Sequence, residues 1–168
     1  MRHIYRMLAL WCVAVAAIAQ PFVLDARATQ ATYLQITNGS YIQEAQVFAT
    51  CARLKPGQVV SVHYQAEVTN PNGYNVGIGS VLRAWDYNVD ATGNSVFVRN
   101  YNAVPPVMTN VTPDMHHLVA RGSIADTVSY ALSGNTRCYT LVLWGVASGG
   151  AGIINVEQGY GFLQVLVH

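Results

Sequence analysis

The sequence predicts an all-β protein: an antiparallel β-sandwich of about eight to ten strands with a jelly-roll or immunoglobulin-like topology. The main observation is the stretch from Val59 to Trp85, which has the pattern of two long strands joined by the turn Asn70-Pro71-Asn72-Gly73. In the first of these strands apolar and polar residues alternate, which indicates one buried and one solvated face. A second observation is the absence of an amphipathic helical pattern after the N-terminal stretch.

The alternation predicts which side chains of this strand form the core. The expected inner row is Val60, Val62, Tyr64, Ala66 and Val68, and the expected outer row is Ser61, His63, Gln65, Glu67 and Thr69. The preceding turn, Lys55-Pro56-Gly57, supplies a proline that presets φ and a glycine that accepts a positive φ.

The remaining strands are predicted from shorter patterns between turns. We expect them at residues 32–37, 41–54, 74–85, 95–100, 137–147, 153–157 and 160–168, with two more within 115–133. In 41–54 the alternation groups Ala45, Val47, Ala49 and Cys51 on one face, opposite Gln46, Phe48 and Thr50. The strand at 137–147 is apolar on both faces and should be central, and the final strand should dock against the first strand or a sheet centre.

Two further segments have specific expectations. Gly77 and Gly79 lie on one face of their strand, which indicates a bulge or another backbone packed closely over them. Residues 101–114 contain three prolines and are expected to be irregular.

The first 28 residues have the three parts of a secretory signal peptide: early arginines, an apolar run from Met7 to Ala19, and small residues at a cleavage site. We expect cleavage after Ala28, with cleavage after Ala19 as the alternative, leaving residues 29–168 as a single β-sandwich domain. A membrane anchor is the other interpretation, but the run is shorter than the ~20 residues that span a bilayer. The predicted location is therefore secreted or periplasmic, with no membrane span after signal removal.

Two cysteines, Cys51 and Cys138, remain in residues 29–168. A pair in an exported chain predicts one disulfide. In the chain-entropy model such a bond constrains the unfolded state by roughly 4–5 kcal/mol. Free thiols or a metal pair are the alternatives, but neither cysteine has a second cysteine or a histidine at metal-ligand spacing.

Charge is low after the signal sequence. Residues 29–168 keep six of the nine Lys and Arg and seven of the eight Asp and Glu, a formal charge of −1, together with eleven Asn. This provides no electrostatic surface for nucleic acid or anionic lipid. Such a surface contacts other molecules through neutral hydrogen bonds, which favours a glycan or protein ligand.

Aromatic and amide side chains form the leading candidate site. The candidate ligand-binding residues are Tyr74, Trp85, Tyr87, Tyr101 and Asn102, which fall near predicted strand ends and loops. Aromatic rings supply flat apolar area, and asparagine both donates and accepts hydrogen bonds, the combination that sugars require. Packing into the core is the alternative for each ring.

Metal binding is a second possibility. His116, His117 and Met115, with His63, have ligand types that suit copper, although adjacent histidines on an unbroken strand point to opposite faces. Asp86 and Asp90 are candidates for calcium. Otherwise no cofactor is expected.

No catalytic pattern is present, since no spacing places two carboxylates together and no Gly-x-Ser-x-Gly elbow occurs. The sequence therefore predicts a secreted, non-enzymatic binding protein, lectin-like or protein-binding. The alternatives are a structural subunit of an extracellular or cell-surface assembly, which would form homo-oligomers, and a periplasmic copper- or calcium-binding protein.

Overall fold

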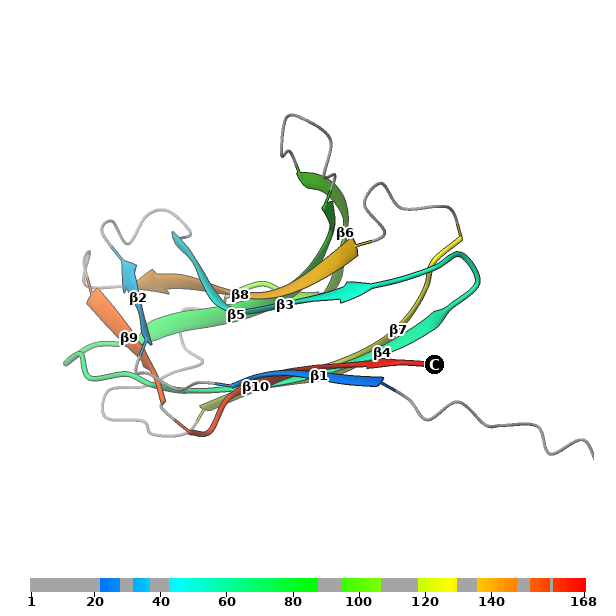
Figure 1. Cartoon of the computed structure of the whole chain (residues 1–168). Coiled ribbons are helices and arrows are strands. Elements are labelled where there is room, and N and C mark those ends of the chain that lie inside the picture. Colours follow the sequence, from blue (N-terminus) through cyan, green and yellow to red (C-terminus); the bar gives the residue numbers. More distant parts are fainter. Residues whose placement is uncertain are drawn as a thin grey trace, which may run out of the picture.

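The computed structural model describes residues 22–27, 32–36, 43–87, 95–106, 118–129, 136–147, 152–157 and 159–168. These residues form ten strands in two antiparallel sheets packed face to face (Figure 1), which confirms the predicted all-β sandwich. The described part of the chain contains no helix that could cross a membrane.

The first sheet has six strands, but two pairs of them lie end to end, so the sheet is four strand positions wide. We call each position a path. Its strands are β1 (Phe22–Arg27), β2 (Thr32–Ile36), β4 (Val59–Thr69), β7 (Leu118–Thr127), β9 (Gly152–Val156) and β10 (Phe162–Val167). β1 pairs with β10 and β2 pairs with β9, so β1 and β2 are successive halves of one path beside the β9–β10 path. β4 pairs with both β10 and β9 on one side and with β7 on the other.

The second sheet has the order β3 (Gln43–Arg53), β8 (Thr136–Ala147), β5 (Val76–Tyr87) and β6 (Ser95–Val104). The chain crosses between the sheets after β2, β3, β4, β6, β7 and β8. Eight strand paths in two sheets with these crossings form a jelly roll. β8 is central, as its two apolar faces predict, and β10 lies inside the first sheet between β1 and β4.

The core lies between β4 and the strands β5 and β8. All five residues of the predicted inner row of β4 are at most 3% exposed, which confirms the alternation. They pack in one cluster with Tyr139, Leu141 and Leu143 of β8. Burying each valine and leucine side chain of this cluster contributes about 1.5–3 kcal/mol. Thr69 departs from the predicted outer row: it is 5% exposed, and its hydroxyl donates a hydrogen bond to Glu157.

The predicted faces of β3 are wrong because the strand contains a bulge. Its register against β8 shifts between Gln46 and Phe48. Uninterrupted alternation would place Val47 and Phe48 on opposite faces of the strand. Because of the shift, Phe48 lies in the core and Val47 also packs against the core. Cys51 is consequently exposed on the outer face rather than grouped with Val47.

β6 is longer than predicted, since it continues to Val104 instead of ending at Asn100. Its pairing with β5 shifts twice, and Asn102 has a positive φ of 48°, so the strand bends without leaving the sheet. The expectation of an irregular segment over 101–114 is therefore wrong for its first four residues. Where two strands were expected within 115–133, the described residues of that range contain one, β7.

β1 lies within the first 28 residues, the stretch that the sequence assigns to a signal peptide. It pairs with β10 over its whole length. The signal peptide itself and the position of its cleavage stay predictions.

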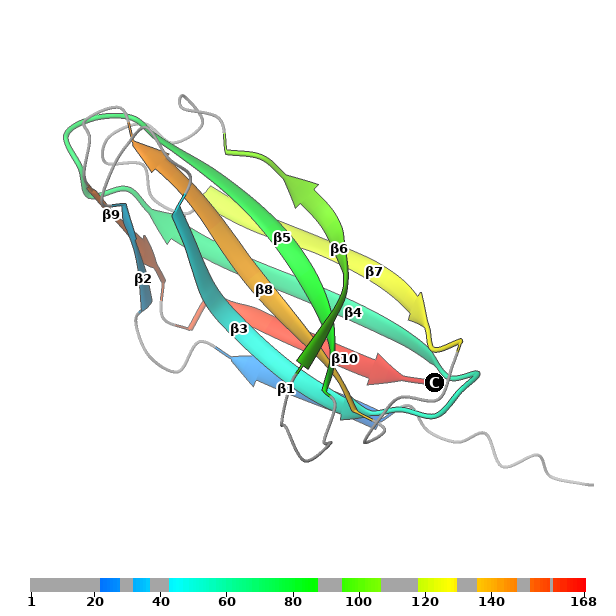
Figure 2. The same ribbon diagram turned by 90° about the horizontal axis from the view of Figure 1, so that it is seen from above.

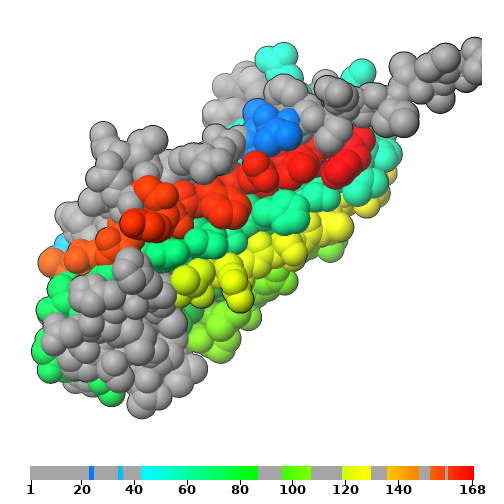
Figure 3. Space-filling view, turned by 90° about the horizontal axis from the view of Figure 1, so that it is seen from below, coloured from blue at the N-terminus to red at the C-terminus, as the bar shows by residue number. Residues whose placement is uncertain are grey.

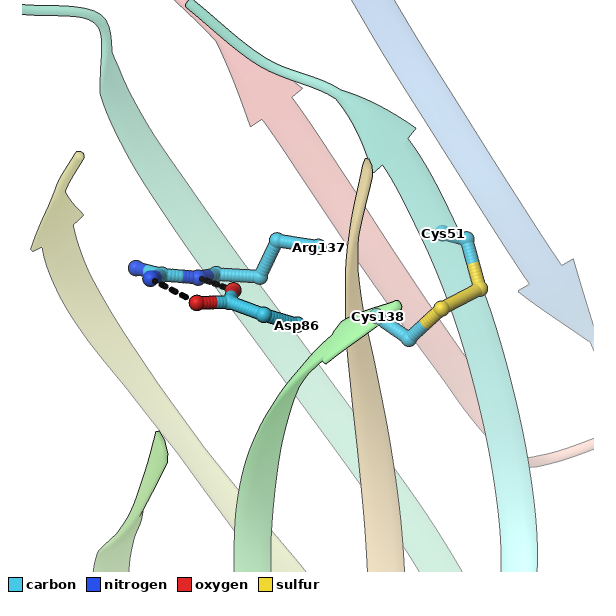
Figure 4. Close-up of a disulfide and its surroundings, with 4 residues drawn as sticks. All are labelled: Cys51, Asp86, Arg137 and Cys138. Carbon is cyan, nitrogen blue, oxygen red and sulfur yellow. Dashed lines mark hydrogen bonds and ion pairs between the residues drawn. A yellow bond between two sulfur atoms is a disulfide. The ribbon is translucent and has the colours of Figure 1, made fainter. Parts of the chain in front are cut away.

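Four buried side chains join the two sheets by charge and hydrogen bonding, and Figure 4 shows two of them, Arg137 and Asp86. Arg137 is 2% exposed, and its Nε and Nη2 donate to Asp86 at 2.7 and 3.1 Å. Its Nη1 donates to Asp126 of β7, in the other sheet, at 2.9 Å. The Tyr139 hydroxyl donates to the same Asp126 oxygen at 2.9 Å. We call Asp86, Asp126, Arg137 and Tyr139 the buried cluster.

Two members of the buried cluster, Arg137 and Tyr139, have pKa values raised above their usual range. Burial alone would lower the pKa of the Arg137 guanidinium, but the hydrogen bonds to Asp86 and Asp126 raise it above its usual range. Burial, reinforced by Asp126, raises the pKa of Tyr139 and of the nearby Tyr101. The Tyr101 hydroxyl is buried and makes no hydrogen bond with a described residue.

Gly79 gives a direct test of the packing, because the end of β6 passes over it as the paired glycines predicted. A Cβ on Gly79 would collide with the carbonyl oxygen of Val104 and lie 2.7 Å from the nitrogen of Pro106. Both are backbone atoms, so Gly79→Ala should lower the free energy of unfolding by about 2–3 kcal/mol in urea titrations. The control Gly73→Ala, with no atom within 4 Å of its Cβ, should change it by less than about 0.5 kcal/mol. Equal effects would contradict this packing.

The buried cluster predicts a large effect of Arg137→Met. Two carboxylates would stay buried without their cation, so the free energy of unfolding at pH 7 should fall by about 3–5 kcal/mol. Adding Asp86→Asn should restore part of that loss. The exposed Arg53→Met is the control, expected within about 0.5 kcal/mol of the native protein. A loss below about 1 kcal/mol for Arg137→Met would show that the cluster does not help to hold the sheets together.

Candidate functional site

The outer face of the four-stranded sheet contains a hollow of about 470 Å³. It is lined by Glu44 and Gln46 of β3, Cys138, Thr140 and Val142 of β8, and Arg83 and Trp85 of β5. Figure 2 looks down on this face, with β3, β8, β5 and β6 nearest the viewer, and Figure 1 shows the sheet rising toward β6. We call this the outer hollow. Its volume falls within the range of about 300–1,000 Å³ that is usual for small-ligand sites.

An aromatic pair borders the outer hollow. Trp85 is directly opposite Phe97 of β6, and the two rings meet edge to face, with centroids 5.2 Å apart and planes at 67°. Phe97 is 47% exposed although it is a large apolar side chain. The pair therefore presents an accessible apolar surface beside the polar lining.

A bidentate ion pair crosses the outer hollow from β5 to β3. Arg83 Nη1 and Nη2 donate to the two carboxylate oxygens of Glu44 at 2.9 and 2.7 Å. The indole Nε1 of Trp144 donates to Glu44 at 2.7 Å. The hydrogen bond from Arg83 is the main reason that the pKa of Glu44 lies below its usual range, with a smaller contribution from Trp144. Glu44 is therefore a fixed anion at neutral pH.

The disulfide between Cys51 and Cys138 is present, as predicted. The two cysteines are directly opposite each other on β3 and β8, so the bond links neighbouring strands of one sheet. Figure 4 shows it on the opposite side of β8 from Arg137. Cys138 lines the outer hollow, and the disulfide ties the edge strand that carries Glu44 to the centre of the sheet. A disulfide of this kind suggests an oxidising environment.

The structure does not bring together the four predicted ligand-binding side chains that it describes. Trp85 lines the outer hollow, whereas Tyr74 and Tyr101 pack against the core. Asn102 is exposed, and its amide donates to the carbonyl oxygen of Ser123 on β7 at 3.1 Å, bridging the two sheets. The side chain of Tyr87 lies outside the described residues. Proximity in sequence grouped residues that strand alternation separates.

The metal candidates are only partly described. Met115, His116 and His117 lie outside the described residues, and His63 is exposed on the outer face of the first sheet. The described part of the chain has no cluster of three His, Cys, Asp or Glu side chains suited to a metal ion. Asp86, one of the two candidates for calcium, instead binds Arg137 through both carboxylate oxygens, and the other candidate, Asp90, lies outside the described residues.

Sequence reasoning missed most of the residues around the outer hollow: Glu44, Gln46, Arg83, Phe97, Thr140, Val142 and Trp144. Their common signal is a position on the outward row of strands that neighbour one another in space. That signal needs the strand order, which local alternation does not contain. Arg83 within a long apolar strand is the one local clue, because a cation there needs an anionic partner.

No known protein family matches the sequence, and no curated protein sequence is significantly similar to it. Solved structures are similar in fold. The structure of the infectious bursal disease virus Gx strain has a TM-score of 0.52 at 13% identity, over 89% of this chain and 36% of that chain. The VP2 subviral particle of infectious bursal disease virus has a TM-score of 0.53 at 10% identity, over 89% and 37%.

At these identities the two viral structures show the jelly-roll fold alone, and this chain spans little more than a third of their length. A looser similarity is found to TmCBM61 in complex with β-1,4-galactotriose, with a TM-score of 0.38 at 15% identity, over 84% of this chain and 80% of that chain. A TM-score this low supports neither a shared fold nor a shared function.

The ion pair predicts a pH dependence of the outer hollow. Because the folded pKa of Glu44 lies below 4.5, the contact should be complete above pH 4.5 and lost as pH falls through the folded pKa. A carboxyl titration by NMR should show this low midpoint, with the Trp144 indole resonance shifting in parallel. In Arg83→Met the midpoint should rise toward 4.5. The Arg99→Met control should leave it unchanged, and an unchanged midpoint in Arg83→Met would contradict the pair.

Proposed function

We propose that this protein binds a neutral glycan in the outer hollow and acts by binding rather than by catalysis. The observation that carries the proposal is the arrangement of Trp85 beside the Arg83–Glu44 pair in an open depression of small-ligand size. An apolar ring beside fixed hydrogen-bonding groups is complementary to a sugar, which has C–H faces and hydroxyl edges.

The aromatic pair would supply the apolar part of the contact. Trp85 is held by its edge-to-face contact with Phe97, so little conformational freedom would be lost on binding. A pyranose ring stacked on this surface would cover Phe97, which is otherwise exposed to solvent.

The polar lining favours a neutral ligand. Arg83 and Glu44 neutralise each other, so an anionic ligand would have to compete with Glu44, and a cationic ligand with Arg83. Neighbouring sugar hydroxyls can donate to the carboxylate and accept from the guanidinium without separating the pair. Gln46 and Thr140 add neutral donors and acceptors.

The same geometry supports binding without hydrolysis. A glycosidase needs two carboxyl groups about 5–10 Å apart, one of them able to give a proton. Glu44 is the one carboxylate among the described residues that line the outer hollow, and its lowered pKa makes it a poor proton donor. With the disulfide, this favours the secreted or periplasmic binding protein that the sequence predicts.

The test is a glycan array with the exported, oxidised protein, followed by calorimetry on the best ligand. Trp85→Ala should weaken binding at least ten-fold, about 1.4 kcal/mol, because the stacking surface is lost. Gln46→Ala should have a smaller effect in the same direction. The control is Tyr160→Ala, since Tyr160 is 57% exposed beside β10 on the other sheet. Binding to no glycan, or equal affinity for Trp85→Ala and the control, would refute the proposal.

A structural subunit is the second candidate, and the edge strand β6 favours it. Val96, Phe97 and Val104 of this strand are 54%, 47% and 54% exposed. Long edge strands with exposed apolar residues pair readily with another copy of the chain. Light scattering of the protein used on the glycan array distinguishes glycan binding from a structural role. A particle mass that increases with protein concentration, in a protein that binds no glycan, would favour the structural subunit.

A further inference from the structure

We propose that the exported chain begins at Gln20, because signal peptidase cleaves after Ala19 and leaves β1 in the folded protein. The sequence contains two cleavage patterns, Ala17-Ile18-Ala19 and Ala26-Arg27-Ala28. Both place small residues where the peptidase needs them. Cleavage after Ala28 is the expectation from sequence, and it would remove a strand of the sheet. The inference is independent of the ligand proposed above.

β1 is fully integrated into the first sheet. All six of its residues are paired with β10, from Phe22 opposite Val167 to Arg27 opposite Phe162. Leu24 packs against the core, and its partner Val165 is fully buried, whereas Val23 is 47% exposed. Figure 3 shows the described atoms of β1 (blue) against β10 (red), with β4 on the other side of β10.

β1 is also half of a strand path rather than an addition to the sheet. β1 and β2 together run beside β10 and β9, so the path is complete only when both are present. Without β1, β10 would become an edge strand, and the backbone groups that it directs toward β1 would lose their partners. Cleavage after Ala28 would thus leave one of the eight paths of the jelly roll half empty.

The N-terminal sequence is compatible with the earlier site. Cleavage after Ala19 leaves an apolar region from Met7 to Val15 or Ala16, within the usual 7–15 residues, followed at once by the small-residue pattern. Signal peptides are removed during export, before the chain folds, so pairing of β1 cannot shield the bond after Ala28. The choice of site must therefore be made by the peptidase from the sequence.

The direct test is to express the full chain in a bacterial host, purify it from the periplasm and measure its intact mass. A mass that begins at Gln20 is expected. A mass that begins at Thr29, or an uncleaved chain from Met1, would overturn the proposal. The Ala28→Leu protein should still begin at Gln20, so its mass should differ from that of the unsubstituted protein only by the larger side chain. Ala19→Leu should prevent cleavage after residue 19.

A second test asks whether β1 is part of the exported fold. Leu24→Asp and Val23→Asp change neither cleavage pattern. If β1 is retained, Leu24→Asp should lower the melting temperature of the exported protein by roughly 5–10 °C, because it places a charge against the core. Val23→Asp, at an exposed position, should change it by less than about 2 °C. Identical melting temperatures for both variants and the unsubstituted protein would show that β1 is absent.

Discussion

Along β5 and β8 the antiparallel register sets Asp86 opposite Arg137 and Trp85 opposite Cys138. Because neighbours on a strand point to opposite faces, the first pair enters the sandwich and the second lies on its outer face. One register therefore builds the buried cluster and the floor of the outer hollow together. A slip of β8 by one residue would turn Arg137 outward and Cys138 inward, so the hydrogen bonds of the cluster also hold the floor of the hollow in place.

Covalent and non-covalent links hold different parts of this sandwich. The disulfide joins β3 to β8 within one sheet, and so stabilises the edge strand that carries Glu44. The two sheets are joined instead by the apolar core and by the contact from Arg137 to Asp126. The disulfide therefore does not link the two layers. The bond still constrains the unfolded chain, since it spans 87 residues.

The sequence predicts those features of the structure that depend on residues close together in the chain. The alternation in β4 holds because that strand has no bulge, and the closely packed Gly79 is visible because only glycine leaves room for a crossing backbone. The alternation in β3 fails at Val47 because the bulge arises from pairing with β8, about a hundred residues away. The outer hollow is non-local in the same way. Trp85 stands out as an aromatic residue, but its neighbour Glu44 becomes visible only when β3, β8 and β5 are known to be adjacent.

Three of the six Lys and Arg after residue 28 make contacts within the described part of the chain. Arg137 pairs with the carboxylates of the buried cluster, and Arg83 pairs with Glu44. Arg99 lies over the ring of Tyr101, with its guanidinium carbon 5.5 Å from the ring centroid. The formal charge of residues 29–168 is only −1, so association should depend on shape and short-range hydrogen bonds. Selectivity must then come from how rigidly the lining is held. The disulfide, the Trp144–Glu44 hydrogen bond and the bidentate ion pair all act on that one property, because each fixes β3 relative to its neighbours.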